Sequence, residues 1–257
     1  MLKSVGIAVL ALLLISCGAP RPRPVSPQPA PASSAPPAAP RAGTTLYRID
    51  PAQSELRVLV YRAGAMAKFG HNHVIANRML SGRIDFAGTA TASSFSISIP
   101  VADFFVDDEE LRRQEGSDFP GEIPDDAKQG TLHNMLSPAL LDAAEYPVIE
   151  VRGANITETN GGLTATLSVS VAGHESTFVA AFSLETDARR LSVAGTLELR
   201  QSALGLAPFS VMMGALQVRD DMRLKFKIVA IGAYFPSPLD SRMGVPSGAI
   251  SMAAAGS

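Results

Sequence analysis

The chain has 257 residues, of which 46% are hydrophobic and 18% charged, and its formal net charge is −2. Residues 1–43 hold four basic and no acidic side chains, so the remainder carries 18 basic against 24 acidic side chains, a net charge of −6. An acidic domain argues against a nucleic-acid partner. Because the chain has one cysteine, no disulfide can form within it, and its stability must come from a buried core.

Residues 1–16 have the anatomy of a bacterial signal peptide. Lys3 supplies a positive start, and residues 5–15 form an apolar stretch that is short for a bilayer span. The stretch ends in LISCG at residues 14–18, which resembles the lipobox of bacterial lipoproteins, where the cysteine is acylated and the chain is cut before it. We therefore expect Cys17 to carry lipid. The alternatives are an ordinary secretory signal or a short uncleaved anchor.

Residues 17–43 are predicted to be a linker between this acylated cysteine and the rest of the chain. Nine prolines and the lack of apolar periodicity indicate an extended, solvated segment. At about 3.1 Å per residue it could reach roughly 80 Å. Gly18 and Ala19, with no Asp after the cysteine, resemble lipoproteins sent to the outer membrane, so we expect a lipid anchor on the periplasmic side of the bacterial envelope.

Apolar and polar residues alternate with period two through the domain predicted at residues 44–233. The clearest runs are 94–99, 163–171 and 222–230, and weaker ones are 46–50, 55–61, 79–86, 148–152, 176–184 and 190–200. Each run has one face for a core and one for water, as antiparallel strands require. Turn signals such as Asn160-Gly161 separate them. Many strands linked by hairpins indicate closure into a barrel or a two-sheet sandwich, followed by a flexible tail at residues 234–257.

One polar, helix-prone insertion interrupts the strands between residues 107 and 142. The acidic run 107–110 is placed to begin one short helix, where acidic side chains suit the helix dipole. Because such runs are more often solvated than metal-bound, we interpret it as a solvated helix start. Residues 124–126 are placed to begin a second helix that runs toward Met135. The insertion could cap one end of a barrel.

Several short motifs resemble the YceI-like family. They are YRIDPAQS at residues 47–54, LSPALLD at 136–142, YPVI at 146–149, RQSALG at 200–205 and VRD at 218–220. The resemblance covers about residues 46–231 and implies an all-β, lipocalin-like antiparallel barrel of about eight strands with a short helical insertion. It also implies a long apolar chain, such as a polyisoprenoid, an isoprenoid quinone or a fatty acid derivative, bound inside. The chain departs from the family pattern at Gln53, where His is usual, and in the histidine-rich segment 68–74.

A barrel of about eight strands has room for packed side chains or for one slim ligand. The residues whose alternation predicts that they point inward are Val58, Val60, Phe86, Phe95, Ile97, Ile99, Leu167, Val169, Phe182, Leu197, Leu224 and Phe226. A filled core without a cavity is the alternative for all of them. The family resemblance favours a tunnel.

His71 and His73 are the sharpest chemical feature. Residues i and i+2 of an extended segment point the same way, so both imidazoles could contact the polar head of a ligand, for example a quinone carbonyl. A solvated loop is one alternative. Another is a metal or redox-partner site completed by a third histidine, with His133 the first choice, since three of the four histidines could converge at one barrel mouth.

No catalytic constellation is apparent in the sequence. It contains no Gly-x-Ser-x-Gly elbow, phosphate loop or His-Glu-x-x-His motif, and its single cysteine is assigned to lipid. We therefore predict a non-enzymatic, membrane-tethered lipid-binding protein with no cofactor besides a possible bound isoprenoid lipid or quinone. A homodimer is possible.

Overall fold

Antiparallel strands dominate the computed structural model of the protein, which describes residues 43–160, 162–187 and 189–232. The strands are β1 (Thr45–Ile49), β2 (Glu55–Ala63), β3 (His73–Asn77), β4 (Ser81–Phe86), β5 (Ser94–Pro100), β6 (Phe105–Val106), β7 (Val148–Thr159), β8 (Gly162–Val171), β9 (His174–Thr186), β10 (Arg190–Arg200), β11 (Ser210–Val211) and β12 (Leu216–Gly232). The α-helices are α1 (Glu109–Glu115) and α2 (Asp125–Leu136). Short 3-10 helices include η2 (Ala67–Phe69), η3 (Ala90–Ala92) and η7 (Met212–Gly214).

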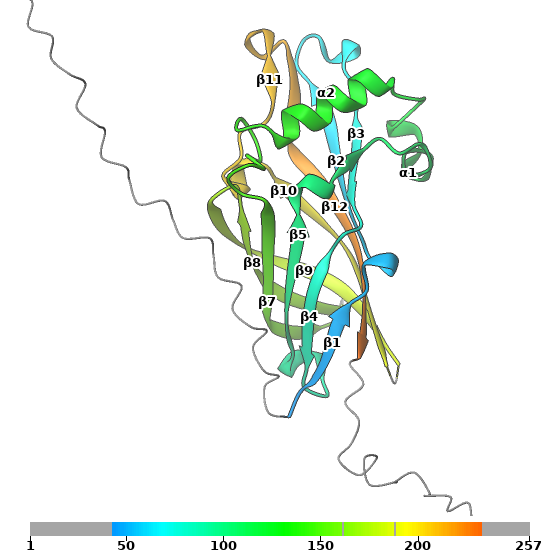
Figure 1. Cartoon of the computed structure of the whole chain (residues 1–257), viewed down its shortest axis with the longest axis vertical. Helices are drawn as coiled ribbons and strands as arrows, with labels where there is room; N and C mark the ends of the chain where they lie inside the picture. Colours follow the sequence, from blue (N-terminus) through cyan, green and yellow to red (C-terminus); the bar gives the residue numbers. More distant parts are fainter. Residues whose placement is uncertain (1–42, 161, 188, 233–257) are drawn as a thin grey trace, which may run out of the picture. The chain divides into compact units, whose positions relative to one another are not determined.

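Eight of these strands close into a barrel, in the order β1-β4-β5-β7-β8-β9-β10-β12 (Figure 1). The ring closes because the end of β12 pairs with β1, at Tyr47 opposite Gly232. Closure leaves none of these eight strands with a free edge along its paired part. The predicted all-β barrel of about eight strands with a helical insertion is confirmed.

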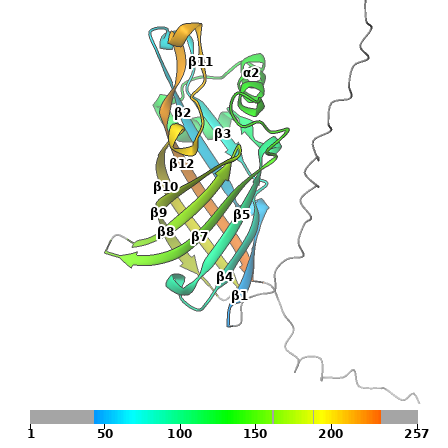
Figure 2. The ribbon, with the colours of Figure 1, turned by 90° about the vertical axis from the view of Figure 1, so that its left-hand side faces the viewer.

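The long strand β12 pairs with β1 at one end of the barrel and with β2 toward the other end. Residues 230–232 pair with β1 at one end, and residues 217–227 pair with β2 toward the other end. From β2 the sheet continues through β3 to β6, and α2 contacts β6. Figure 2 shows α2 beside the part of the sheet formed by β2 and β3, with the β11 hairpin extending beyond it. We call the end that carries α2 and β11 the upper end.

Helix α1 begins where the acidic run predicts. The side chain of Asp108 accepts a hydrogen bond from the Leu111 backbone N–H at 3.0 Å, which satisfies one free donor of the first turn. At the other end of the helix, the Glu115 carboxylate accepts hydrogen bonds from Arg57 on β2 (2.6 Å) and Lys225 on β12 (2.5 Å). Burial favours a higher pKa for Glu115, but these two cations outweigh it and lower the pKa. The ion pairs fasten α1 to the outside of the barrel.

A second, smaller core lies between α1 and the outer face of β2 and β3. Leu59 and Val74 point away from the barrel interior, yet each is only 1% exposed because Leu111 and Phe119 cover them. The predicted alternation of β2 therefore holds, but its outward face is partly buried. This outer core sets the position of α1 against the wall.

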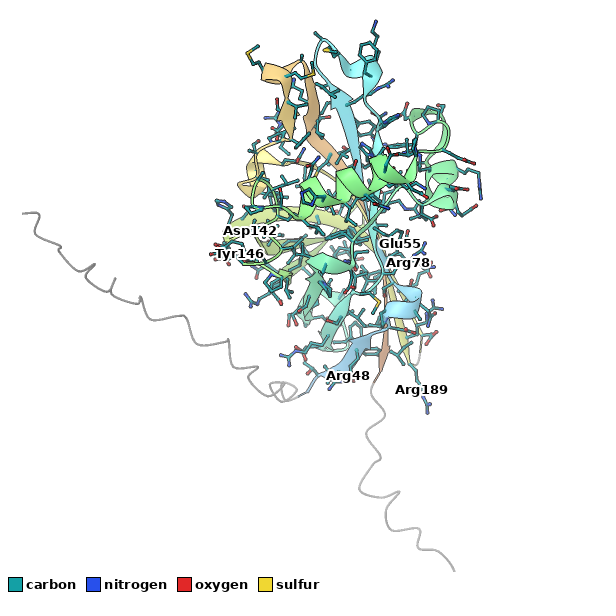
Figure 3. The ribbon with its side chains drawn as sticks, turned by 45° about the horizontal axis from the view of Figure 1, so that its top comes forward. Arg48, Glu55, Arg78, Asp142, Tyr146 and Arg189 are labelled. Carbon is teal, nitrogen blue, oxygen red and sulfur yellow. The ribbon has the colours of Figure 1, made fainter. Side chains whose placement is uncertain are left out.

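A further ion pair lies on the barrel surface, where Arg78 contacts Glu55 (2.8 Å; Figure 3). Arg48 and Arg189 lie near the lower end in the same view. No helix among the described residues is long and apolar enough to cross a membrane. The predicted signal peptide, Cys17, the linker and the tail lie outside the described residues, as does Gly161 of the predicted Asn-Gly turn.

Candidate functional site

The barrel encloses a cavity of about 400 Å³. Its lining runs from Phe86, at the level of the start of β1, to Arg62, near the upper end of β2. Thr131 and Met135 of α2 also line it, so the helical insertion covers its upper part. The space between the strands is therefore hollow rather than filled by side chains.

The residues predicted to point inward all line this cavity. They are Val58, Val60, Phe86, Phe95, Ile97, Ile99, Leu167, Val169, Phe182, Leu197, Leu224 and Phe226. Their alternation along the strands places one apolar face on the interior. Whether they contact a ligand stays a prediction.

Two glycines help to keep the cavity open. Gly153 is directly opposite Phe95, and Gly195 is opposite Phe226, on neighbouring strands. A Cβ atom at Gly153 would lie 1.9 Å from the Phe95 ring, and one at Gly195 would lie 2.5 Å from the Phe226 ring. The absence of a Cβ therefore lets each ring lie against the wall of the partner strand instead of projecting into the cavity.

Polar side chains gather at the upper end of the cavity. The polar lining residues there are Arg62, His71, His73, Thr131, Asn134, Gln201 and Gln217. Ser93, near the lower end, also lines the cavity, but its hydroxyl is engaged with the backbone at Ala87 and Thr89. The site thus has a long apolar body and one polar end, which suits an amphipathic molecule.

His71 and His73 lie together at this polar end, with ring centroids 6.2 Å apart. His73 begins β3 opposite Val60, so its side chain shares the inner face of the barrel. Its Nδ1 lies 2.6 Å from the Asp107 carboxylate, which is fully buried. That carboxylate also accepts hydrogen bonds from the Val74 backbone N–H (2.9 Å) and the Arg112 guanidinium (2.6 Å).

The ionised state of Asp107 determines which His73 nitrogen carries a proton. Burial favours a higher pKa for Asp107, but the hydrogen bonds from His73, Val74 and Arg112 outweigh it and lower the pKa. A carboxylate can only accept, so His73 Nδ1 carries the proton in this bond. The Nε2 atom remains available, and in the neutral ring it accepts a hydrogen bond.

His71 differs from His73 in having no carboxylate partner among the described contacts. Burial, followed by the neighbouring His73 and the Arg112 charge, lowers the pKa of His71. A neutral imidazole is therefore favoured at this position near pH 7. Such a ring both donates and accepts one hydrogen bond, which suits a carbonyl or hydroxyl head group.

Comparison with known proteins agrees with this architecture. The family model of the YceI-like domain matches residues 47–230. The chain belongs to the YceI-like family. No curated protein matches the sequence significantly.

Two solved structures are similar to this YceI-like chain. One is Burkholderia cenocepacia BcnA, with 17% identity over 70% of this chain and 98% of that protein and a TM-score of 0.53. The other is a polyisoprenoid binding domain from Saccharophagus degradans, with 13% identity over 73% of this chain and 98% of that domain and a TM-score of 0.49. At these identities the first similarity shows a shared fold.

The three-histidine metal site is not assembled in this YceI-like barrel. His133 is exposed on α2 and is not part of the cavity wall, and His174 is exposed at the start of β9, beside Gly205. Among the described residues, no group of three His, Cys, Asp or Glu side chains is arranged to hold a metal ion. The alternative of a metal site completed by His133 therefore finds no support among the described residues.

The interpretation of residues 107–110 as a solvated helix start was wrong for Asp107. This residue adopts a left-handed backbone (φ 57°), which turns the chain from β6 into α1 and directs its carboxylate inward. Arg112, 2% exposed, also donates to the backbone oxygens of Asn72 and Pro120. Sequence reasoning missed both residues, because no local pattern links Asp107 to a histidine 34 positions earlier.

Proposed function

We propose that this YceI-like protein binds one long-chain apolar ligand, such as a polyisoprenoid, an isoprenoid quinone or a fatty acid derivative. The observation that supports this most directly is the 400 Å³ cavity, with its apolar body and single polar end. Its volume falls within the range of about 300–1,000 Å³ that is common for small-molecule sites. A slim chain with one polar head fits that distribution of side chains.

The apolar wall provides the affinity. Each methylene removed from water contributes about 0.8 kcal/mol, so a ligand with twelve enclosed carbons gains roughly 10 kcal/mol before the costs of association. Discrimination between ligands then depends on the polar end. In its neutral form His73, oriented by Asp107, offers an acceptor to a hydroxyl head, and His71 can donate to a carbonyl or a hydroxyl head.

The proposal includes attachment to the bacterial cell envelope. Acylation of Cys17 would tether the barrel through a linker of about 25 residues, which reaches roughly 80 Å in an extended conformation. Such a tether keeps the barrel close to a reservoir of lipid without fixing its orientation. The protein would serve as a carrier or buffer of its ligand.

Native mass spectrometry tests the cargo. Residues 44–257, purified without detergent from a bacterial periplasm, should show an added mass of several hundred daltons that extracts into organic solvent. An increment that matches a metal ion and disappears with a chelator would contradict the proposal. A bare chain mass after exposure to envelope lipids would contradict it as well.

Variants at the polar end test the head-group contacts. The double variant His71→Ala/His73→Ala should retain less ligand while its unfolding transition stays cooperative, since the apolar wall is unchanged. His133→Ala, on the exposed face of α2, is the matched control and should retain ligand normally. Equal ligand retention by both variants would exclude a role for the histidine pair.

A further inference from the structure

The loops at the upper end of the barrel carry an unusual group of exposed apolar side chains. Residues 64–70, which include η2, and residues 210–215, which include β11 and η7, together form what we call the tip. Eight large apolar residues are exposed in the described chain, and four of them lie in the tip: Phe69, Val211, Met212 and Met213. Met213 is fully exposed, and Phe69 and Met212 are 63% and 61% exposed.

The two loops form one surface. The Met66 backbone N–H donates to the Ala215 carbonyl oxygen at 2.7 Å, and Ala63 pairs with Gln217 just below. Gly64 permits this approach, since a Cβ there would lie 2.4 Å from the same Ala215 oxygen. The two loops that carry the apolar residues of the tip therefore lie side by side at one end of the barrel.

The hairpin turn places two methionines in a strained backbone conformation. Met212 and Met213 both have positive φ, 53° and 54°, which L-residues other than Asn and Gly adopt unfavourably. An Asn-Gly pair would form such a turn with less strain. The turn instead presents two flexible, apolar side chains that are largely exposed.

The two stretches of sequence that carry the tip contain basic but no acidic side chains. Residues 56–84 and 199–219 contain no acidic side chain, although the chain beyond residue 43 carries a net charge of −6. Lys68 lies over the Phe69 ring, 4.9 Å from its centroid, and Arg62 holds the Gly70 carbonyl oxygen at the base of the tip. Exposed apolar side chains with adjacent cations are the combination that binds the interface of an anionic bilayer.

The tip also adjoins the cavity. Arg62, Gly70 and Leu216, at the base of its two loops, line the upper end of the cavity. The first described residues lie at the opposite end, since β1 pairs with the last residues of the 17-residue strand β12. Seventeen strand residues span about 55 Å, less than the roughly 80 Å reach of the predicted linker. A tethered barrel can thus turn its tip toward the membrane that holds it.

We propose that the tip is a membrane-docking surface that inserts Phe69, Met212 and Met213 into the interface of an anionic lipid bilayer and places the upper end of the cavity next to it. This inference rests on the proposed function for the reason to dock, namely passage of an apolar ligand between bilayer and cavity. Docking itself does not require a loaded cavity. Vesicle contact and lipid extraction are therefore separate measurements, and one can fail without the other.

Depth-dependent fluorescence quenching tests the proposal on the full chain. Cys17→Ser leaves no cysteine, so Met213→Cys can be labelled alone with a polarity-sensitive dye and reconstituted into vesicles of phosphatidylglycerol and phosphatidylethanolamine. Spin-labelled lipids should quench this dye several-fold more than the same dye at Thr91→Cys, in η3 at the lower end. Equal quenching at both positions, or emission at position 213 that vesicles do not change, would overturn the proposal.

Charge reversal provides the second readout. Lys68→Glu should reduce quenching at position 213 on anionic vesicles, whereas Lys227→Glu, the same charge change on the exposed wall of β12, should leave it unchanged. Vesicles of phosphatidylcholine alone should show weaker tip quenching than anionic vesicles. An equal effect of both charge reversals would show that net charge, and not the tip, determines the contact.

Discussion

Replacing Asp107 by Asn removes one charge from a buried ion pair without changing the shape of the side chain. Asp107 is fully buried, and its partner Arg112 is 2% exposed, with 2.6 Å between the carboxylate and the guanidinium. Asn tolerates a left-handed backbone at least as well as Asp, so the substitution adds no backbone strain at φ 57°. The loss comes from the uncompensated guanidinium and from the broken hydrogen bond to His73.

Loss of one partner of a buried pair costs about 3–5 kcal/mol, a large part of the roughly 5–15 kcal/mol that stabilises a typical domain. Urea denaturation followed by circular dichroism at pH 7 should show a lower midpoint for Asp107→Asn with an unchanged slope. Glu110→Gln is the matched control, because its pair with Arg113 on the same helix is exposed, and its midpoint should stay close to that of the unchanged chain.

A loss below about 1 kcal/mol for Asp107→Asn would refute the reasoning, since it would mean that water or another group compensates Arg112. A second substitution checks the cause. Adding Arg112→Met to Asp107→Asn removes the stranded cation, so part of the lost stability should return. If the double variant is instead less stable by the sum of both effects, the pair does not act as a unit.

Further predictions concern pH and the cavity wall. The pKa of Asp107 is lowered in the folded state, so the carboxylate contributes its full stabilisation above the unfolded pKa of about 4 and loses it as pH falls through the folded pKa. The difference in unfolding free energy between the unchanged chain and Asp107→Asn should therefore shrink in urea titrations below about pH 4. Gly153→Ala places a Cβ 1.9 Å from the Phe95 ring and should lower the free energy of unfolding by about 1–3 kcal/mol, and Phe95→Leu should relieve most of this. Ala165→Phe projects a ring into the cavity, so lipid extraction should yield less bound ligand from a chain that still unfolds cooperatively; full occupancy would place the ligand elsewhere.

Most strands and both helices could be predicted from short sequence patterns. The alternation at 94–99, 163–171 and 222–230 predicted three strands that the structure contains, because one buried face forces a period of two on the sequence. The structure extends the first two by one residue each, whereas β12 begins six residues before the predicted run and ends two residues after it. The starts of α1 and α2 could also be predicted from their acidic residues, since capping and dipole effects act within one helical turn. The run at 148–152 understated β7, which continues to Thr159 as a strand with mixed exposure and a register shift.

Whether the barrel is hollow could not be read from the sequence. An inward apolar side chain satisfies the same alternation in a packed core and in a cavity wall, and only the spacing of strands around the closed ring separates the two. Gly153 and Gly195 illustrate this: their role depends on the aromatic ring on the neighbouring strand, which is 58 positions earlier for Gly153 and 31 positions later for Gly195.

The sequence by itself determined the strand pattern, the helical insertion and the proximity of His71 to His73, because each depends on residues a few positions apart. The tertiary structure decided that Asp107 and Arg112 orient His73, that His133 stays outside the site, and that the loop at 64–70 meets the turn at 212–215. These contacts join segments tens to more than a hundred positions apart. Their formation depends on strand register and ring closure, which the cooperative burial of the whole domain sets and no local window of sequence encodes.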